Sequence, residues 1–362
     1  MQTFDAPKLA TDLDQLAQSF SRCSDVHAPC FVLHCPSRNW QWRWPDAPTT
    51  QQPYFIASAT KLYVTTLVMQ LRHEGSLALD APAHTYLPPG LMDGLHCMHG
   101  QDASKQITVR HLLAHTSGLA DYFEQKQRDG KSQFEKALAQ DFAWSLQDVL
   151  RITREEMQPH FAPGAPQRAL YSDTNYQLLG AIVEALTHTP LEQAIAQRIT
   201  SPLGLHDTWL FTQKTLNRYD SVARLHNGRQ AIRIPLAMAS VRADGGMVST
   251  AQDGIGFLQA FIAGALFPAS YLHDMQAQWN HIFRPLQYGV GIMRFALPWY
   301  FSPFAKVPEM IGHSGASGTV LFHVPELDLY VSGTINQIAR RSLPYRLMTS
   351  MVLQCRKAWS GK

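Results

Sequence analysis

The chain has 362 residues, of which 45% are hydrophobic and 16% are charged, and its formal net charge is +3. This size predicts one large domain or two closely packed ones, and the low charge does not fit a disordered chain. Without a Lys/Arg block no nucleic-acid partner is expected, and without an apolar run of about 20 residues no membrane-spanning segment is expected.

The N-terminal part predicts a helix followed by two strands. Apolar residues at helical spacing favour an amphipathic helix over residues 7–20. Residues 30–34 and 40–44 predict strands joined by a turn at 36–39. Because strand side chains alternate, the three tryptophans of the second strand share one face. We expect them to pack in the core, with a sugar- or base-binding stripe as the alternative.

The next segment predicts a buried helix that begins at a serine. Residues 58–74 are apolar nearly all round, and a helix without a polar face is buried; Gly75 ends it. Ser58 lies in the first turn, where the helix dipole favours negative charge. Lys61 follows on the same face of the helix, so its amine can reach the Ser58 oxygen.

The middle of the chain predicts short helices and loops. Helices are expected within residues 109–118, 145–154 and 174–187. Residues 122–140 form the most charged stretch of the sequence. We expect a solvated insertion there, with a lid over the site as the alternative.

Strands return after about residue 240. One is expected over residues 288–295, and a hairpin is expected from residues 319–323 and 327–334. A helix over residues 337–355 is expected to close the chain.

Strands at both ends with helices between them predict an α/β (α+β) fold, an antiparallel sheet flanked by helices. Residues 1–75 and 240–362 are expected to form a discontinuous α/β domain. Residues 76–239 are expected to form an inserted, mostly helical domain, with the site in the cleft between the two.

Three separated segments carry side chains suited to acyl transfer. Ser58 and Lys61 form Ser-x-x-Lys, Tyr171 begins Tyr-Ser-Asp, and His313 begins His-Ser-Gly. A serine hydroxyl needs a base, and a Lys61 ammonium near Tyr171 is expected to lower the phenol's pKa from about 10. Tyr171 would then take the Ser58 proton, while backbone N–H groups near Ser58 and after Gly315 would stabilise the oxyanion.

In this order, the motifs resemble the serine β-lactamase and penicillin-binding-protein superfamily, nearest its class C-like branch, which also holds esterases, D-aminopeptidases and DD-carboxypeptidases. The resemblance runs from about residue 25 to the C-terminus. It includes the stretches 107–119, 171–180, 202–205 and 245–250.

The resemblance implies a β-lactamase/transpeptidase-like fold and a serine hydrolase that acts through a covalent acyl-enzyme. Small esters, β-lactams and D-amino-acid amides are the implied substrates, and the oligomeric state is not readable. The implied catalytic residues are Ser58 as nucleophile, Lys61 as its partner and Tyr171 as base. The implied substrate-binding residues are Asp173, His313, Ser314, Gly315 and Ala316, and the N–H groups of Ser58 and Ala316 form the implied oxyanion hole.

Two residues depart from the family pattern. Asp173 stands where the branch often has Asn; an ionised Asp can only accept hydrogen bonds, favours a charged Lys61 and opposes a Tyr171 phenolate. His313 stands where β-lactamases of this class usually have Lys. With a pKa near 6.5, His313 is expected to bind a substrate carboxylate more firmly below about pH 6.5.

Three other interpretations of the sequence explain fewer of these residues: a metal site, an α/β-hydrolase and a protein without catalytic activity. His111 and His115 have a metal-like spacing but no Glu between them in the His-Glu-x-x-His manner, so a structural role is expected. An α/β-hydrolase would need Gly-x-Ser-x-Gly, which residues 313–318 match only loosely. A catalytically retired β-lactamase-fold binding protein is the alternative function.

The chain contains five cysteines and no Cys-x-x-Cys. An odd number predicts free thiols in a reducing compartment, while a Cys30–Cys35 or Cys23–Cys30 bridge stays open. Zinc spacing is missing, and neither a metal nor a cofactor is expected. The start of the chain has no basic or apolar signal region, which predicts a cytoplasmic location, or a periplasmic one if a signal peptide was removed.

Overall fold

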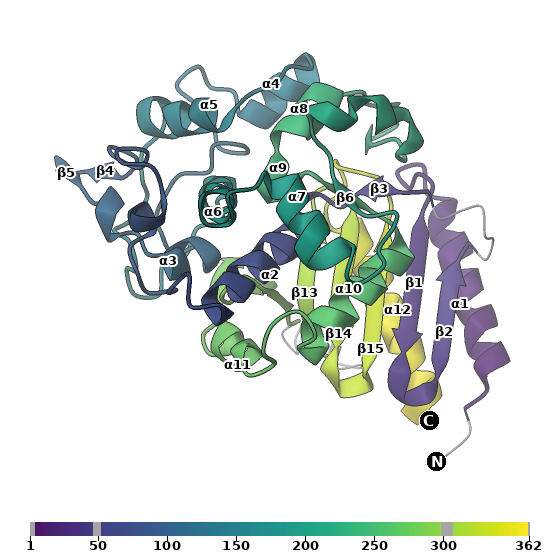
Figure 1. Cartoon of the computed structure of the whole chain (residues 1–362). Coiled ribbons are helices and arrows are strands. Elements are labelled where there is room, and N and C mark those ends of the chain that lie inside the picture. The colour runs from purple at the N-terminus through teal and green to yellow at the C-terminus, as the bar shows by residue number, and fades with distance from the viewer. Residues whose placement is uncertain (1–3, 46–51, 298–306, 361–362) are drawn as a thin grey trace.

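An eight-stranded antiparallel sheet forms the centre of the fold (Figure 1). Its strand order is β10-β11-β12-β13-β14-β15-β1-β2, so two strands from the N-terminal part complete a sheet built from the C-terminal third. The computed structural model describes residues 4–45, 52–297 and 307–360. The predicted antiparallel sheet flanked by helices is therefore confirmed.

The sheet strands are short, as is usual in globular proteins. They are β1 (Cys30–Cys35), β2 (Trp40–Trp44), β10 (Asn280–Phe283), β11 (Leu286–Tyr288), β12 (Met293–Phe295), β13 (Met310–Gly315), β14 (Thr319–Val324) and β15 (Leu329–Thr334). Smaller strands pair outside this sheet: β3 (Tyr54–Phe55), β9 (Met247–Ser249) and β6 (Trp209–Leu210) together, β4 (Cys97–Met98) with β5 (Gln101–Asp102), and β7 (His226–Asn227) with β8 (Gln230–Ala231).

Helices account for most of the remaining regular structure. They are α1 (Ala6–Ser21), α2 (Thr60–His73), α3 (Val109–Leu113), α4 (Gln133–Ala139), α5 (Leu146–Arg151), α6 (Asp173–Thr187), α7 (Leu191–Ile195), α8 (Pro235–Ser240), α9 (Arg242–Gly245), α10 (Ala251–Ala263), α11 (Tyr271–Gln276) and α12 (Leu343–Ser360).

The alternation of strand side chains assigns the two faces of the sheet to two cores. Phe31 and Leu33 of β1 point to the face that packs against α1 and α12. Val32 of the same strand points to the opposite face, where α10 lies across β14, β15 and β1 (Figure 1). Since both faces are covered at the middle of the sheet, β1, β14 and β15 are buried nearly throughout, whereas β2 and β10 alternate between buried and more exposed residues.

Most of the predicted elements are present. The N-terminal helix, the first two strands and the hairpin of β14 and β15 are confirmed. Trp40 and Trp42 are buried, which supports the core role of the tryptophans. The predicted free thiols are confirmed, since all five cysteines are free, and neither the Cys30–Cys35 nor the Cys23–Cys30 bridge that the sequence left open is formed.

Two boundaries were wrong. The expected strand over 288–295 is interrupted by a turn, in which the Gly289 N–H bonds to the Ile292 carbonyl and Gly291 has φ +73°. The last helix begins at Leu343 rather than at residue 337. Pro344 stands in its first turn, the position in which a helix tolerates proline.

Helix α2 is buried as predicted, with eleven of its fourteen residues inaccessible to solvent. It lies between the sheet and α6 (Figure 1), with α9 also packed against it. The division into two domains stays a prediction. Among the described residues, no helix has the length and hydropathy needed to cross a bilayer.

Candidate active site

Ser58 stands on a tight turn between a strand and the buried helix. The turn begins after β3, where the Ile56 N–H bonds to the Met247 carbonyl at 3.0 Å. Ala57 then adopts φ +45°, a left-handed conformation that costs an Ala about 1–2 kcal/mol. A single 3₁₀ turn, Ala57–Ala59, leads into α2, so Ser58 is half-buried and held on rigid backbone.

The C-terminal end of β13 lies directly against this turn. A Cβ on Gly315 would be only 2.2 Å from the Ile56 carbonyl oxygen, so the third residue of His-Ser-Gly must be glycine for the strand to approach. The close approach places Ser314, Gly315 and Ala316 beside Ser58, and all four residues line the same cavity.

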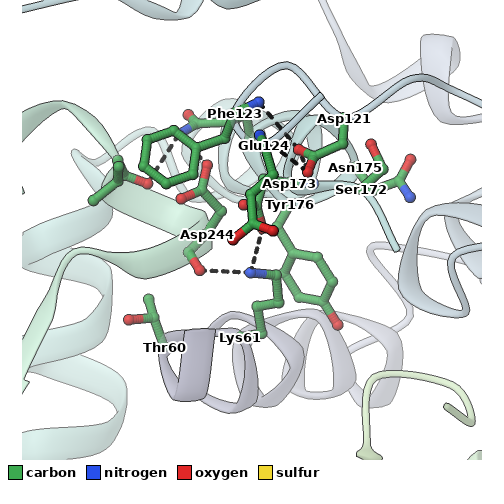
Figure 2. Close-up of polar contacts among 12 residues, drawn as sticks. Thr60, Lys61, Asp121, Phe123, Glu124, Ser172, Asp173, Asn175, Tyr176 and Asp244 are labelled. Carbon is green, nitrogen blue, oxygen red and sulfur yellow. Dashed lines mark hydrogen bonds and ion pairs between the residues drawn. The ribbon is translucent and has the colours of Figure 1, made fainter. Parts of the chain in front are cut away.

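Lys61 follows Ser58 by three residues and its side chain is fully buried, pointing toward Asp173 and Asp244 (Figure 2). Its ammonium donates to the backbone carbonyl of Asp244 at 2.6 Å and forms an ion pair with Asp173, 2.7 Å from Nζ to Oδ1. The Asp173 contact is a close ion pair, not a well-aligned hydrogen bond. Burial lowers the pKa of Lys61, but Asp173, Tyr171 and Asp244 together raise it above its ordinary value.

Two further buried carboxyl groups surround this ion pair. Asp244 accepts hydrogen bonds from Tyr122 and Gln177 through Oδ2, at 3.0 and 2.8 Å. Asp121 accepts from the backbone N–H of Asp173 at 3.1 Å. Burial and repulsion from Asp173 raise the pKa of Asp121 and of Asp244 well above the usual range. Burial raises the pKa of Asp173 as well, but the Lys61 ammonium at 2.7 Å opposes that rise, so Lys61 with Asp173 is the ion pair at the centre.

Tyr171 completes the expected catalytic set. Its ring lies 5.0 Å from the Lys61 ammonium and 4.4 Å from the ring of His115, measured to ring centroids. Burial raises the pKa of Tyr171 above its ordinary value, and Asp173 adds to this, although Lys61 and hydrogen bonds from Lys61 and Ser58 oppose it. The pKa of Tyr171 was expected to lie below about 10 because of Lys61. It is raised instead, because the effect of burial exceeds that of the Lys61 ammonium, whose charge Asp173 already compensates.

His313 is fully buried and does not line the cavity. Its Nδ1 lies 2.6 Å from the Ser314 carbonyl, which can only accept, so Nδ1 carries the proton. Nε2 therefore accepts from the Tyr288 hydroxyl at 3.0 Å, and Tyr288 accepts from Tyr176 at 3.1 Å.

Burial lowers the pKa of His313 to about 3, with a contribution from the Lys61 ammonium. The expected titration near pH 6.5 was therefore wrong, and so was the carboxylate preference built on it.

The cavity beside Ser58 has a volume of about 660 Å³. Ser58, Tyr171 and Asp173 line it. Residues 283–297 of the β10–β12 meander contribute mostly apolar side chains, with Arg284 among them, and residues 341–350 around the start of α12 contribute mostly polar ones.

The charged stretch 122–140 contributes one residue to this cavity. Glu124 lines it and forms a two-pronged ion pair with Arg341, at 2.7 and 2.9 Å. Asp121 holds Glu124 in place by accepting its backbone N–H at 3.3 Å. Glu124 thus connects the charged stretch to the pocket wall formed around the start of α12.

The two histidines at metal-like spacing have structural contacts. His111 accepts from the Thr108 N–H at 3.2 Å as part of a capping box, and His115 accepts from the Ser172 N–H at 3.1 Å. The described residues contain no group of three or more His, Cys, Asp or Glu side chains that could hold a metal ion.

Comparison with known proteins identifies the family of the chain. The sequence profile of the Beta-lactamase family matches residues 40–344, most of the chain. The chain belongs to the Beta-lactamase family. The family expected from the motifs is thereby confirmed, while the class C-like branch stays a prediction.

Similar family members carry several activities in their names. Esterase EstB of Burkholderia gladioli is 29% identical over 300 residues, 73% of this chain and 70% of that protein. A putative D-alanyl-D-alanine carboxypeptidase of Escherichia coli (strain K12) is 33% identical over 167 residues, 45% of this chain. The matched region spans only 35% of the carboxypeptidase and 39% of penicillin-binding protein 4 of Amycolatopsis lactamdurans.

A solved structure shows the same fold over nearly the whole chain. The D-amino acid amidase from Ochrobactrum anthropi SV3, complexed with L-phenylalanine, superposes with a TM-score of 0.75 and 23% identity. The superposition covers 97% of this chain and 99% of the amidase. At this identity the likeness shows a shared fold alone.

Sequence reasoning missed the groups that hold Lys61. Asp244 acts through its backbone carbonyl, for which no side-chain motif exists, although it directly precedes the Gly245-Gly246 stretch. Glu124 lies in the charged stretch, for which a solvated insertion was expected, and Asp121 directly precedes that stretch. Phe283 follows no recognisable motif, and its place in the cavity depends on the β10–β11 turn.

His313 provides a direct test of this electrostatic description. Because its folded-state pKa is lowered to about 3, His313 should remain neutral from pH 8 down to about pH 4. In an NMR titration its ring protons, assigned by their loss in His313→Asn, should keep a constant shift over that range. A midpoint near pH 6.5 for that signal would show that the side chain is solvated.

Proposed function

We propose that this member of the Beta-lactamase family is a serine hydrolase that acts through a covalent acyl-enzyme on Ser58. Small esters, β-lactams and D-amino-acid amides are the proposed substrates. The observation that carries the proposal is that Ser58 and Tyr171, from two distant segments, line one cavity, with the buried Lys61 ammonium 5.0 Å from the centroid of the Tyr171 ring. The names of the relatives and of the amidase with the same fold support the same range of acyl substrates.

In the acylation step, the Ser58 oxygen attacks the substrate carbonyl carbon while its proton passes to the Tyr171 oxygen. Tyr171 must act as a phenolate, a minor form because its pKa is raised, and the adjacent Lys61 ammonium stabilises it. Collapse of the tetrahedral intermediate breaks the bond to the leaving group, which receives the proton from Tyr171. The product of this step is an ester on Ser58.

In the deacylation step, water replaces the leaving group. Tyr171 takes a proton from water, hydroxide oxygen attacks the acyl carbon, and Ser58 leaves with the proton that Tyr171 returns. The carboxylic acid product then dissociates.

The oxyanion site is proposed to consist of two backbone N–H groups. Ser58 lies at the start of a 3₁₀ turn, and the first N–H groups of a helical turn have no acceptor inside it. Ala316 follows the end of β13 and lines the same cavity. Two donors aimed at one oxygen stabilise the developing negative charge.

The first test is the loss of the nucleophile. A panel of p-nitrophenyl esters, nitrocefin and D-alanyl peptides is incubated with wild type and with Ser58→Ala. We expect turnover of at least one substrate class by wild type, and a fall in kcat of at least about 1,000-fold in the variant.

Thermal unfolding followed by circular dichroism checks that Ser58→Ala still folds. Ser314→Ala serves as the comparison, since Ser314 belongs to the His-Ser-Gly segment and lines the same cavity as Ser58. Turnover that survives in Ser58→Ala but disappears in Ser314→Ala would assign the nucleophile to Ser314. Absence of turnover and of covalent labelling in wild type would favour a retired, binding-only protein.

The second test concerns Asp173. Its carboxylate raises the pKa of Tyr171, so Asp173→Asn should lower that pKa, while the Asn oxygen can still accept from Lys61. Because the phenolate is the active form, the acid limb of the kcat/KM profile should move to lower pH, by about one pH unit or more.

The matched control is Asp253→Asn, since Asp253 is also a partly buried aspartate but interacts with Thr208 and Asp207 instead of with Lys61. Its pH profile should coincide with that of wild type. An acid limb that stays in place in Asp173→Asn, or moves to higher pH, would show that Tyr171 is not the titrating base.

A further inference from the structure

Phe283 is exposed at the mouth of the cavity. It is 53% accessible and is the one large hydrophobic side chain that is exposed within residues 4–45, 52–297 and 307–360. It ends β10, at a point where the pairing with β11 shifts register between His281 and Phe283. Because Phe283 lines the same cavity as Ser58, its exposed ring is available to a ligand bound there.

The ring of Phe283 lies next to the ring of Tyr171, with centroids 5.7 Å apart and planes inclined by 47°. Two buried side chains, His115 and Tyr288, pack against Tyr171 at 4.4 and 6.0 Å. Phe283 is therefore the aromatic neighbour of Tyr171 that remains open to a ligand.

The apolar surface continues from Phe283 into the cavity. Leu286, Met293 and Phe295 of the same meander also line the cavity, together with one guanidinium group, that of Arg284. The segment around the start of α12 contributes hydroxyl and guanidinium groups. A bound molecule thus meets mostly apolar groups on the β10–β12 side.

Tyr171 determines which part of the substrate reaches Phe283. In the proposed mechanism Tyr171 protonates the leaving group, so the leaving atom must lie within hydrogen-bonding reach of the Tyr171 hydroxyl. The atoms attached to the leaving atom then extend over the surface around Tyr171. The exposed aromatic part of that surface is Phe283.

We propose that Phe283 is a specificity-determining residue that contacts a bulky apolar leaving group, above all an aromatic one, of the ester or amide substrate. This inference rests on the proposed function of Ser58 and Tyr171. It adds to that function a substrate class, aryl or arylalkyl esters and amides, and the residue that selects it. Tilted packing of a substrate ring on Phe283 is a favourable aromatic arrangement.

The test compares leaving groups at a constant acyl group. Hydrolysis of phenyl acetate and of ethyl acetate forms the same acetyl-enzyme, and kcat/KM reports the step in which the leaving group departs. Comparing variants with wild type cancels the difference in intrinsic reactivity between the two esters. We expect Phe283→Ala to reduce the preference for phenyl over ethyl acetate by at least about 10-fold, and Phe283→Trp to retain it.

Two controls separate this effect from general damage. Phe4→Ala removes a ring that packs on Trp359, away from the cavity, and should leave the preference unchanged. The ratio of p-nitrophenyl hexanoate to p-nitrophenyl acetate has a constant leaving group. That ratio should be the same in Phe283→Ala as in wild type.

A phenyl-over-ethyl preference within twofold of wild type in Phe283→Ala would overturn the inference. A changed ratio of p-nitrophenyl hexanoate to p-nitrophenyl acetate hydrolysis in Phe283→Ala, with an unchanged phenyl-over-ethyl preference, would also overturn the inference. Phe283 would then contact the acyl group and not the leaving group. Ester hydrolysis that persists in Ser58→Ala would instead contradict the proposed function. The two failures are therefore distinguishable in the same set of assays.

Discussion

The buried ion pair between Lys61 and Asp173 is the interaction on which the site depends. Moving an ammonium group out of water costs several kcal/mol unless close partners compensate for the lost hydration. Here the compensation comes from the Asp173 carboxylate and from the Asp244 carbonyl, so Lys61 of α2 connects the start of α6 to the last turn of α9. Because Ser58 precedes Lys61 by less than one helical turn, the same contacts position the nucleophile. Removing one member of this pair would leave a buried charge without a partner.

The ion pair also determines which groups near Ser58 are neutral. Asp173 and burial keep the pKa of Tyr171 high, and the Lys61 ammonium together with burial keeps the pKa of His313 low. His313 is then neutral and donates to the Ser314 carbonyl, which ties its ring to the strand that borders the cavity. In the proposed mechanism, proton transfer is therefore assigned to Tyr171, whose active form is scarce at rest, while His313 has a structural role next to the reacting groups.

Sequence reasoning reached the sheet, the buried helix and three residues that line the cavity because they depend on local patterns. Alternating apolar strands, an apolar helix and three short motifs are all readable along the chain, and Ser58, Tyr171 and Asp173 do line one cavity. The burial of His313 was not readable, since Tyr288 and Tyr176, which surround it, come from other elements. The direction of the Tyr171 pKa depends on desolvation, which only the folded arrangement defines. Phe283 and Asp244 carry no motif, because one acts through exposure and the other through its backbone.

The central claim is that Ser58 is a nucleophile made reactive by the anchored Lys61. It is tested most directly by inactivation with a fluorophosphonate, followed by peptide mapping with mass spectrometry, in wild type and in Lys61→Met. Methionine removes the ammonium but keeps an unbranched side chain, and thermal unfolding verifies that the variant folds. The account predicts an adduct on the peptide containing Ser58 in wild type, formed at least about 100-fold more slowly in Lys61→Met. An adduct on Ser314 or another serine, or equal rates in the two proteins, would contradict it.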